Sequence, residues 1–329
     1  RALIKFSQKD IDFICHFVEE KVEELGVHEI QIPEMHNIVE GALEKVNPIV
    51  AKSYRDYRNY KQDFVQMLDE VYKKSQSIMY IGDKENSNTD SALVSTKRSL
   101  IFNELNKELY KKFFLTVEEL QAIREGYIYI HDMSARRDTM NCCLFDVKSV
   151  LTGGFEMGNL WYNEPKTLDT AFDVIGDIVL SAASQQYGGF TVPSVDEILE
   201  PYAKRSHENH LNKYRSLGLS EEVAQEIAWK DLKKEMEQGF QGWEYKFNSV
   251  SSSRGDYPFI TMTSGTDISE YGKLVTKTML EVRAGGQGKP GHKKPVLFPK
   301  IVFLYDENLH GPGKPGEDLF EAGIGAFFR

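Results

Sequence analysis

The sequence contains few cysteines, and they are not arranged as a disulfide framework or a metal site requires. Only three cysteines occur in 329 residues, an odd number that argues against a secreted disulfide scaffold and for the reducing cytoplasm. No Cys-x-x-Cys pair is present, so a cysteine zinc site is not expected. No apolar run approaches the roughly 20 residues that span a bilayer, and the first residues, RALIKFSQKD, lack the apolar core of a signal peptide. We therefore expect a cytoplasmic protein without a metal site or membrane contact.

Positive charge is also scarce. The formal net charge is −10, which argues against nucleic acid as a partner because a broad basic face is missing. There is no Gly-x-Ser-x-Gly elbow, and neither a Walker loop nor a dinucleotide fingerprint occurs. The composition, 41% hydrophobic and 27% charged, is typical of a globular protein.

Hydrophobic periodicity divides the chain into a helical first part and a larger mixed part. The first part holds three predicted helices: 8–26, one that follows Pro33, and one that begins at about Pro48. Residues 81–99 are polar and turn-rich and are predicted to form a linker or ordered loop. From residue 100 onward, helical patterns alternate with short apolar strands, which predicts an α/β fold with a largely parallel, buried sheet or barrel. The main predicted strands are YIYIHD, TMNCCLFDV, YPFITMTSG and KPVLFPKIVFLYD, and 218–239 is predicted to be an exposed, charged helix.

Two of the cysteines are adjacent, and they follow an aromatic-rich stretch that ends in His131 and Asp132. If residues 139–147 form a strand, Cys142 and Cys143 point to opposite faces, and Asn141 shares the face of Cys143. The simplest interpretation is that both thiols are small core hydrophobes. The functional interpretation directs one thiol into a cavity, close to the imidazole and carboxylate at the C-terminal end of the preceding strand, where sites of α/β folds collect.

A glycine-rich loop, RAGGQGKPGHKKP at 283–295, lies between a predicted helix and a predicted strand. Its glycines let the backbone approach a ligand, and its lysines supply positive charge. The candidate nucleotide contacts are Gly285, Gly286, Gly288 and Lys289. An exposed flexible turn is the alternative. The histidines of HENH, His207 and His210, have helical spacing without further ligands and are predicted to be solvated.

The order of the motifs resembles that of the anaerobic (class III) ribonucleoside triphosphate reductases. The motifs, in chain order, are ENSNTDSALVSTKRS, GYIYIHD, NCCLFDVKSVLTGGFEMGN, QQYGGFTVPSVDEILEPY, SSSRGDYPFITMTSG, FPKIVFLYDENLH and DLFEAGI. The earlier stretch EIQIPEMHNIVEGALEKVNPIVAKSYRDYR is similar to the later part of an ATP-cone, a regulatory domain whose opening hairpin is missing here. The resemblance implies three parts: a partial ATP-cone at 1–60, a connecting segment at 61–99, and the N-terminal part of the catalytic barrel at 100–329.

The resemblance implies a glycyl-radical enzyme with a ten-stranded α/β barrel, of which this chain forms the N-terminal half. Members of the family reduce ribonucleoside triphosphates with formate. A thiyl radical on a finger-loop cysteine removes the ribose 3′-hydrogen, the 2′-hydroxyl leaves as water, and a second cysteine on a barrel strand provides a hydrogen. The strand cysteine directly follows asparagine in the family, which corresponds to Cys142 after Asn141. His131 and Asp132 match the family's His-Asp near the substrate.

The resemblance also implies partners and cofactors. The family forms homodimers, depends on a radical-SAM activating enzyme, and uses ATP and deoxynucleotide effectors and a structural zinc. Its finger-loop cysteine follows directly on the motif found here as DLFEAGI, where this chain reads GAFFR. We therefore expect a truncated reductase from an interrupted or split gene, inactive alone and without a cofactor bound by this portion. One alternative is a non-catalytic nucleotide-binding or regulatory fragment that assembles with a separately encoded C-terminal half. A decayed gene product that does not fold is another.

Overall fold

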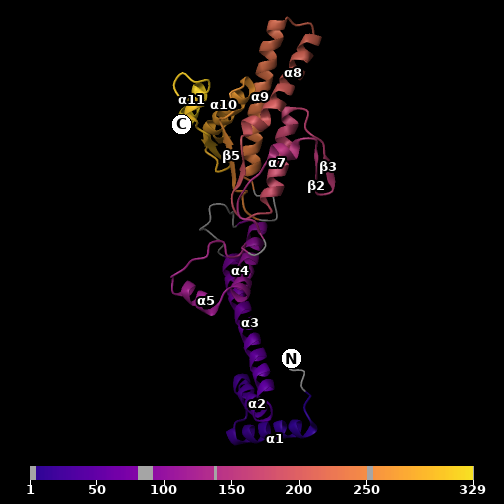
Figure 1. The fold of residues 1–329 in the computed structure, drawn as a ribbon, viewed down its shortest axis with the longest axis vertical. Helices are drawn as coiled ribbons and strands as arrows, with labels where there is room; N and C mark the ends of the chain where they lie inside the picture. Colours follow the sequence, from indigo (N-terminus) through magenta and orange to yellow (C-terminus); the bar gives the residue numbers. More distant parts are fainter. Residues whose placement is uncertain (1–4, 81–91, 137–138, 250–254, 329) are drawn as a thin grey trace. The chain divides into compact units, whose positions relative to one another are not determined.

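The computed structural model describes residues 5–80, 92–136, 139–249 and 255–328 (Figure 1). Its contacts divide the chain into two compact units, Arg1–Gln76 and Ser77–Arg329. In the described residues the first unit is helical, and every strand belongs to the second. No helix in these ranges is long and apolar enough to cross a membrane.

The helices of the first unit begin and end at residues that favour helix ends. These helices are α1 (Gln8–Leu25), α2 (Ile32–Val46) and α3 (Pro48–Tyr80), the last of which continues beyond the unit. α1 begins at a capping box, in which the side chains of Ser7 and Asp10 each accept a hydrogen bond from the other's backbone N–H. It ends at Gly26, whose φ of 57° is left-handed and therefore suits glycine. Pro33 occupies the first turn of α2. The three helices predicted from the sequence are confirmed.

The second unit combines helices with one parallel sheet and two hairpins. Its helices are α4 (Val94–Phe114), α5 (Val117–Arg124), α6 (Val147–Leu151), α7 (Leu168–Ala183), α8 (Val195–Ser216), α9 (Glu221–Phe247), α10 (Glu270–Gly285), α11 (Glu307–His310) and α12 (Glu317–Phe327). Its strands are β1 (Cys143–Leu144), β2 (Phe155–Met157), β3 (Leu160–Tyr162), β4 (Phe190–Val192), β5 (Ile260–Ser264), β6 (Gln287–Lys289), β7 (His292–Lys294) and β8 (Lys300–Phe303). The sheet has the order β1-β4-β5-β8 with parallel neighbours, whereas β2–β3 and β6–β7 are antiparallel hairpins.

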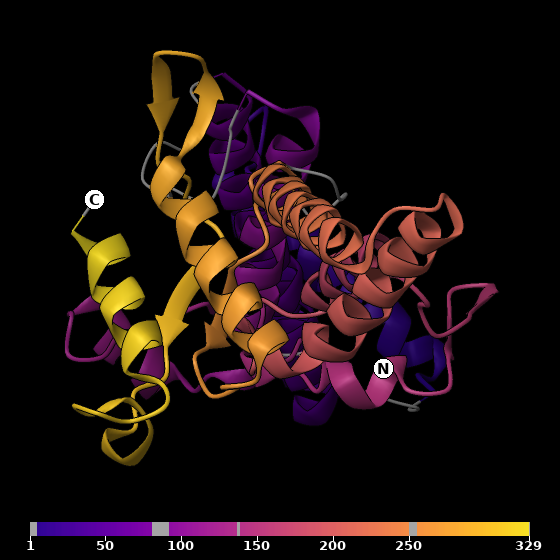
Figure 2. The same ribbon diagram turned by 90° about the horizontal axis from the view of Figure 1, so that it is seen from above.

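The hydrophobic core lies between one face of this sheet and the helices α7 to α10, which pack side by side (Figure 2). On the two central strands, β4 and β5, the apolar residues of this face are buried: Phe190, Val192, Ile260 and Met262. The other face is termed the open face. Strand register places these residues on it: Leu144, Thr191, Thr261, Thr263 and Val302. Leu144 is 77% and Val302 43% exposed. Helices on one face of a parallel sheet, with the other face open, are consistent with part of an α/β barrel, the predicted fold class.

α12 is attached to α10 by charge. The Asp318 carboxylate accepts hydrogen bonds of 2.7 Å from Lys273 and 2.7 Å from Lys277. Burial acts to raise the pKa of Asp318, but these hydrogen bonds and charges outweigh it and lower the pKa to about 2. The carboxylate is therefore ionised at neutral pH.

Several predicted elements are wrong. YIYIHD is not a strand: residues 127–130 have no regular hydrogen-bonded structure, and 131–136 form turns. The helix predicted over 218–239 is α9, and it is not an exposed helix, because α7, α8 and α10 cover its apolar stripe, including Leu232 and Met236. The glycine-rich loop at 283–295 contains the β6–β7 hairpin. Of the predicted linker, 94–99 belong to α4, and 81–91 lie outside the described residues.

Candidate functional site

Cys143 begins the first strand of the sheet, β1, and Cys142 directly precedes it, alongside a glycine pair. Gly188 N donates to Asn141 O at 2.9 Å, and Cys143 N donates to Gly189 O at 3.1 Å. The strand predicted over 139–147 is shorter than expected, since only Cys143–Leu144 is strand. The strand cannot continue past Asp146, because this residue caps the next helix, α6. Its side chain accepts a hydrogen bond from the backbone N–H of Ser149.

The two thiols face opposite ways, as strand alternation predicts. Cys143 is half-buried and packs against the hydrophobic core, whereas Cys142 is exposed. The Cys143 thiol donates to Gln186 Oε1 at 3.0 Å. Burial raises the pKa of Cys143, the neighbouring Cys142 raises it further, and the hydrogen bond with Gln186 opposes both. Cys143 is therefore a neutral thiol at neutral pH.

The sulfur of Cys142 lies between one acceptor and one donor. Its thiol donates to Asn141 Oδ1 at 3.2 Å, and Gly189 N donates to Sγ at 3.1 Å. Asn141 was expected to share the face of Cys143, and this expectation is wrong: its side chain is exposed and lies against Cys142. Asn141 and Cys142 both precede the two-residue strand, and the Asn141 side chain accepts a hydrogen bond from the Cys142 thiol.

Gly188 is required by this arrangement. A Cβ at residue 188 would lie 2.2 Å from Asn141 Oδ1 and 2.5 Å from Cys142 Sγ, far inside van der Waals contact. At Gly189 the closest atom to a Cβ would be 3.7 Å away, an ordinary contact. The two glycines therefore have different tasks, and only the first makes room for the candidate site.

Gln186 was not identified from the sequence. It is 2% exposed, and its Nε2 donates to Gly189 O at 2.8 Å and to Gly188 O at 3.4 Å. Its amide thus contacts both the glycine pair and Cys143. The only sequence signal was its position in QQYGG, two residues before the glycines.

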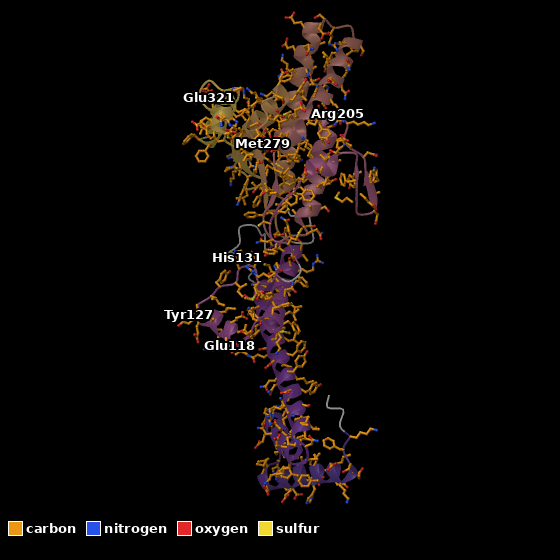
Figure 3. The ribbon with its side chains drawn as sticks, in the orientation of Figure 1. Glu118, Tyr127, His131, Arg205, Met279 and Glu321 are labelled. Atoms are coloured by element: carbon orange, nitrogen blue, oxygen red, sulfur yellow. The ribbon has the colours of Figure 1, made fainter. Side chains whose placement is uncertain are left out.

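His131 and Asp132 are not brought to the cysteines. Figure 3 shows His131 on the segment after α5, and the His131 and Asp132 side chains are 75% and 42% exposed. They pair with each other through Nδ1 and Oδ2, and Arg136 Nε donates to the His131 carbonyl at 2.9 Å. Asp132 has a φ of 50°, a left-handed conformation that is uncommon outside glycine. Among the described contacts, none joins either side chain to Asn141 or Cys142.

The candidate nucleotide contacts lie on or beside the β6–β7 hairpin, which extends from the end of α10 (Figure 2). Gly286 and Gly288 have φ of 63° and 137°, and a Cβ on either would lie 2.9 Å or 2.8 Å from a carbonyl of the opposite strand. These glycines therefore let the two strands approach. Gly285 and Gly286 also line a groove of about 340 Å³ between α9, α10 and the hairpin, whereas Lys289 is exposed on β6.

A buried charged group fixes the base of the hairpin. Glu244 of α9 accepts from Arg283 Nε at 2.7 Å and also from the Gln287 side chain. The side chains of Glu244 and Arg283 are 5% and 20% exposed. The hairpin is therefore attached to the core at its base, and its lysine-bearing strands extend away from this attachment.

The histidine prediction is wrong. His207 is 8% exposed, and its Nδ1 forms a 2.8 Å hydrogen bond with Tyr271 Oη. Burial lowers the pKa of His207, and nearby Glu270 only partly opposes this. His210 instead contacts Glu235 Oε2 at 2.9 Å. The residues described contain no group of three or more His, Cys, Asp or Glu side chains placed to bind a metal ion.

A comparison of the sequence with models of known protein families matches most of the second unit to one family. The family model of the anaerobic ribonucleoside-triphosphate reductase matches residues 85–322. The chain belongs to this family. The ATP cone domain model matches residues 1–63, which lie in the first unit.

Individual relatives of the chain belong to the same family. The anaerobic ribonucleoside-triphosphate reductase of Haemophilus influenzae is 31% identical over 320 residues, which are 94% of this chain and 45% of the relative. That of Enterobacteria phage T4 is 32% identical over 228 residues, 69% of this chain and 37% of the relative. The chain therefore spans less than half the length of these relatives.

Solved structures show the same fold. The anaerobic ribonucleotide reductase from Thermotoga maritima in complex with dATP and CTP aligns with a TM-score of 0.50 and 15% identity, over 82% of this chain and 48% of that chain. Another anaerobic ribonucleotide reductase aligns with a TM-score of 0.53 and 15% identity, over 83% of this chain and 47% of that chain. At this identity the likeness supports the fold alone.

Proposed function

We propose that this chain supplies the strand-cysteine portion of the active site of an anaerobic ribonucleoside-triphosphate reductase, with Cys142 as the hydrogen donor. The observation that supports the proposal is the position of its sulfur, which is exposed, donates to Asn141 Oδ1 at 3.2 Å and accepts from Gly189 N at 3.1 Å. This contact directs the S–H group at a neutral amide oxygen and leaves the sulfur exposed.

In this proposal the substrate is a ribonucleoside triphosphate and the reductant is formate. The C2′–O bond breaks and the hydroxyl takes up a proton from the medium to leave as water, while the S–H bond of Cys142 breaks and its hydrogen forms the new C2′–H bond. Formate supplies the two electrons and leaves as carbon dioxide, which restores the thiol. Asn141 contacts the ribose, and His131 and Asp132 approach the substrate only after their segment moves. The glycyl radical, the initiating cysteine and the structural zinc are assigned to sequence outside these 329 residues.

The first unit is proposed to respond to ATP or deoxynucleotide effectors, and the hairpin residues Gly285, Gly286, Gly288 and Lys289 remain the proposed second nucleotide contact. The intact reductase is proposed to be a cytoplasmic homodimer that is activated by a radical-SAM enzyme. If Lys289 contacts phosphate, Lys289→Ala should weaken nucleotide binding, whereas Lys166→Ala, at an exposed position on another loop, should not. Equal affinity of the two variants would remove the hairpin from the proposal.

The deciding experiment is reconstitution. The 329-residue chain should form no dCTP from CTP with formate and activating enzyme. It should do so when mixed with a polypeptide that supplies the part of the Haemophilus influenzae relative beyond the alignment. Cys142→Ser should abolish this turnover, and Cys143→Ser should retain most of it. Turnover by the chain alone would refute its inactivity, and full turnover by Cys142→Ser would refute the role of Cys142.

A regulatory role is the second candidate, because the ATP cone domain model matches residues 1–63. It predicts ATP binding by the chain together with absence of turnover in every reconstituted mixture. It also predicts that the chain alters the activity of an intact reductase to which it is added.

A further inference from the structure

The two cysteines have different surroundings, and the side chain of Gln186 connects Cys143 to the glycine that contacts Cys142. Gln186 accepts from the Cys143 thiol through Oε1 at 3.0 Å and donates through Nε2 to Gly189 O at 2.8 Å. Gln186 is 2% exposed, so loss of either contact would leave a buried amide group without that partner. The core-side thiol thus fixes the orientation of the amide, and the amide fixes a glycine carbonyl.

The glycine pair continues this linkage to the other thiol. Gly188 N donates to Asn141 O at 2.9 Å, and Gly189 N donates to Cys142 Sγ at 3.1 Å. The Gly189 carbonyl is shared between Gln186 Nε2 and the Cys143 backbone N–H. The N–H and the carbonyl of Gly189 lie in adjacent peptide planes that share its Cα, so a displacement of Gly189 would disturb both contacts.

We propose that Gln186 and Cys143 are positioning residues for Cys142. Together they hold Gly189 so that its N–H supports the Cys142 sulfur while the S–H remains directed at Asn141. The adjacent cysteines therefore have linked roles without forming a disulfide. Cys142 is the reactive group, and the Cys143 thiol donates the hydrogen bond that orients Gln186. The significance for reduction rests on the proposed function, whereas the geometry of the sulfur is independent of it.

The reactivity of Cys142 reports on this geometry. A thiolate is the nucleophile in alkylation, and a backbone N–H that donates to sulfur stabilises the thiolate. Cys142 is already exposed, so local loosening adds little access and removes a donor. The alkylation rate of Cys142 is measured by labelling with iodoacetamide for short times. Fragment mass spectra distinguish labelled Cys142 from labelled Cys143. Cys15, exposed on α1 in the other unit, is the internal reference.

Four variants of the full 329-residue chain test the linkage. Gln186→Met keeps the length of the side chain without its amide, and Cys143→Ala removes the thiol. Each variant should lower the ratio of the alkylation rates of Cys142 and Cys15 about fivefold, which corresponds to the loss of about one hydrogen bond. Cys143→Ser retains a donor and should stay within about twofold of the parent. The double variant Gln186→Met, Cys143→Ala should be no slower than the slower single variant, because both act through one contact.

A control separates positioning from stability. Ser264→Ala disrupts the buried 2.6 Å hydroxyl pair with Thr276, away from the cysteines. It should lower the melting temperature without changing the Cys142 rate. If Gln186→Met does not fold, Gln186→Glu, which keeps the acceptor and loses the N–H donors, takes its place. An unchanged Cys142 rate in folded Gln186 and Cys143→Ala variants would overturn the proposal. So would additive losses in the double variant. Failure of the reconstituted reductase would leave this labelling result unaffected, so the two proposals can fail separately.

Discussion

Replacing Gly188 by alanine tests how closely Asn141 and Cys142 approach the neighbouring strand segment. The added Cβ would lie 2.2 Å from Asn141 Oδ1, 2.5 Å from Cys142 Sγ and 2.7 Å from Asn141 O. Two of these contacts are with the side chains of the candidate site and the third is with the backbone, so rotating a side chain does not relieve the clash. The segment of residues 141 and 142 has to move away from Gly188.

The cost can be estimated in two ways that agree. Overpacking of a filled site costs about 1–3 kcal/mol. Relief by movement loses the hydrogen bonds of Gly188 N to Asn141 O and of Gly189 N to Cys142 Sγ, each about 1 kcal/mol. We expect Gly188→Ala to destabilise the second unit by about 2 kcal/mol, which is a fall in melting temperature of about 4–8 °C for a unit of this size.

The adjacent glycine is the matched control. A Cβ on Gly189 would meet its closest neighbours at 3.7, 3.9 and 4.0 Å, so Gly189→Ala should change stability by less than about 0.5 kcal/mol. Both substitutions restrict the unfolded chain similarly, so the unfolded-state effect cancels in their difference. Urea unfolding followed by tryptophan fluorescence measures both, since Trp243 is 2% exposed in the core of this unit. Equal stability of the two variants would show that the close approach at Gly188 does not exist in solution.

Three further predictions concern charged groups of the second unit. Asp318→Asn should lower the free energy of opening of α12 by about 0.5–1 kcal/mol after allowance for solvent screening. Because the pKa of Asp318 is lowered to about 2, hydrogen exchange of α12 should show the full difference between variant and parent at pH 7. The difference should decrease as the pH falls from 4 towards 2. Because burial lowers the pKa of His207, the unfolded chain takes up a proton that the folded chain does not, so unfolding free energy should fall from pH 7 to 5. His207→Gln should reduce that fall, and an identical pH dependence would contradict the assignment. Glu244→Gln should lower the free energy of unfolding in urea by about 3 kcal/mol because it leaves the half-buried Arg283 guanidinium without its counter-charge. Replacing both residues by Met should cost less.

Sequence patterns predicted the elements whose ends and faces depend on local interactions. α1 follows from its capping box and from Gly26, and α2 from Pro33 in its first turn. The parallel sheet followed from short apolar strands separated by helices. Strand alternation predicted that Cys143 packs against the core and Cys142 does not, although Cys142 lies just before β1.

The errors arise where distant contacts decide. YIYIHD alternates like a strand, but its residues pair with no strand in the described structure. α9 has many charges, and burial of its apolar stripe depends on three helices elsewhere in the chain. Gln186 has no local signature, because its role depends on a thiol 43 positions earlier. The family resemblance named Cys142 and Asn141, whereas the contact between their side chains is a result of the structure.

The adjacent cysteines have a consequence for errors of strand alignment. A shift of one residue between β1 and β4 would turn every side chain of β1 to the other face, and Cys143 would then replace Cys142 on the open face. One thiol would still be exposed on the open face, so a count of exposed thiols would not detect the misaligned strand. The residue before the presented thiol would, however, be a cysteine instead of Asn141, and the acceptor for its S–H would be lost. The asparagine, more than the cysteine, therefore distinguishes the correctly aligned strand from its nearest error.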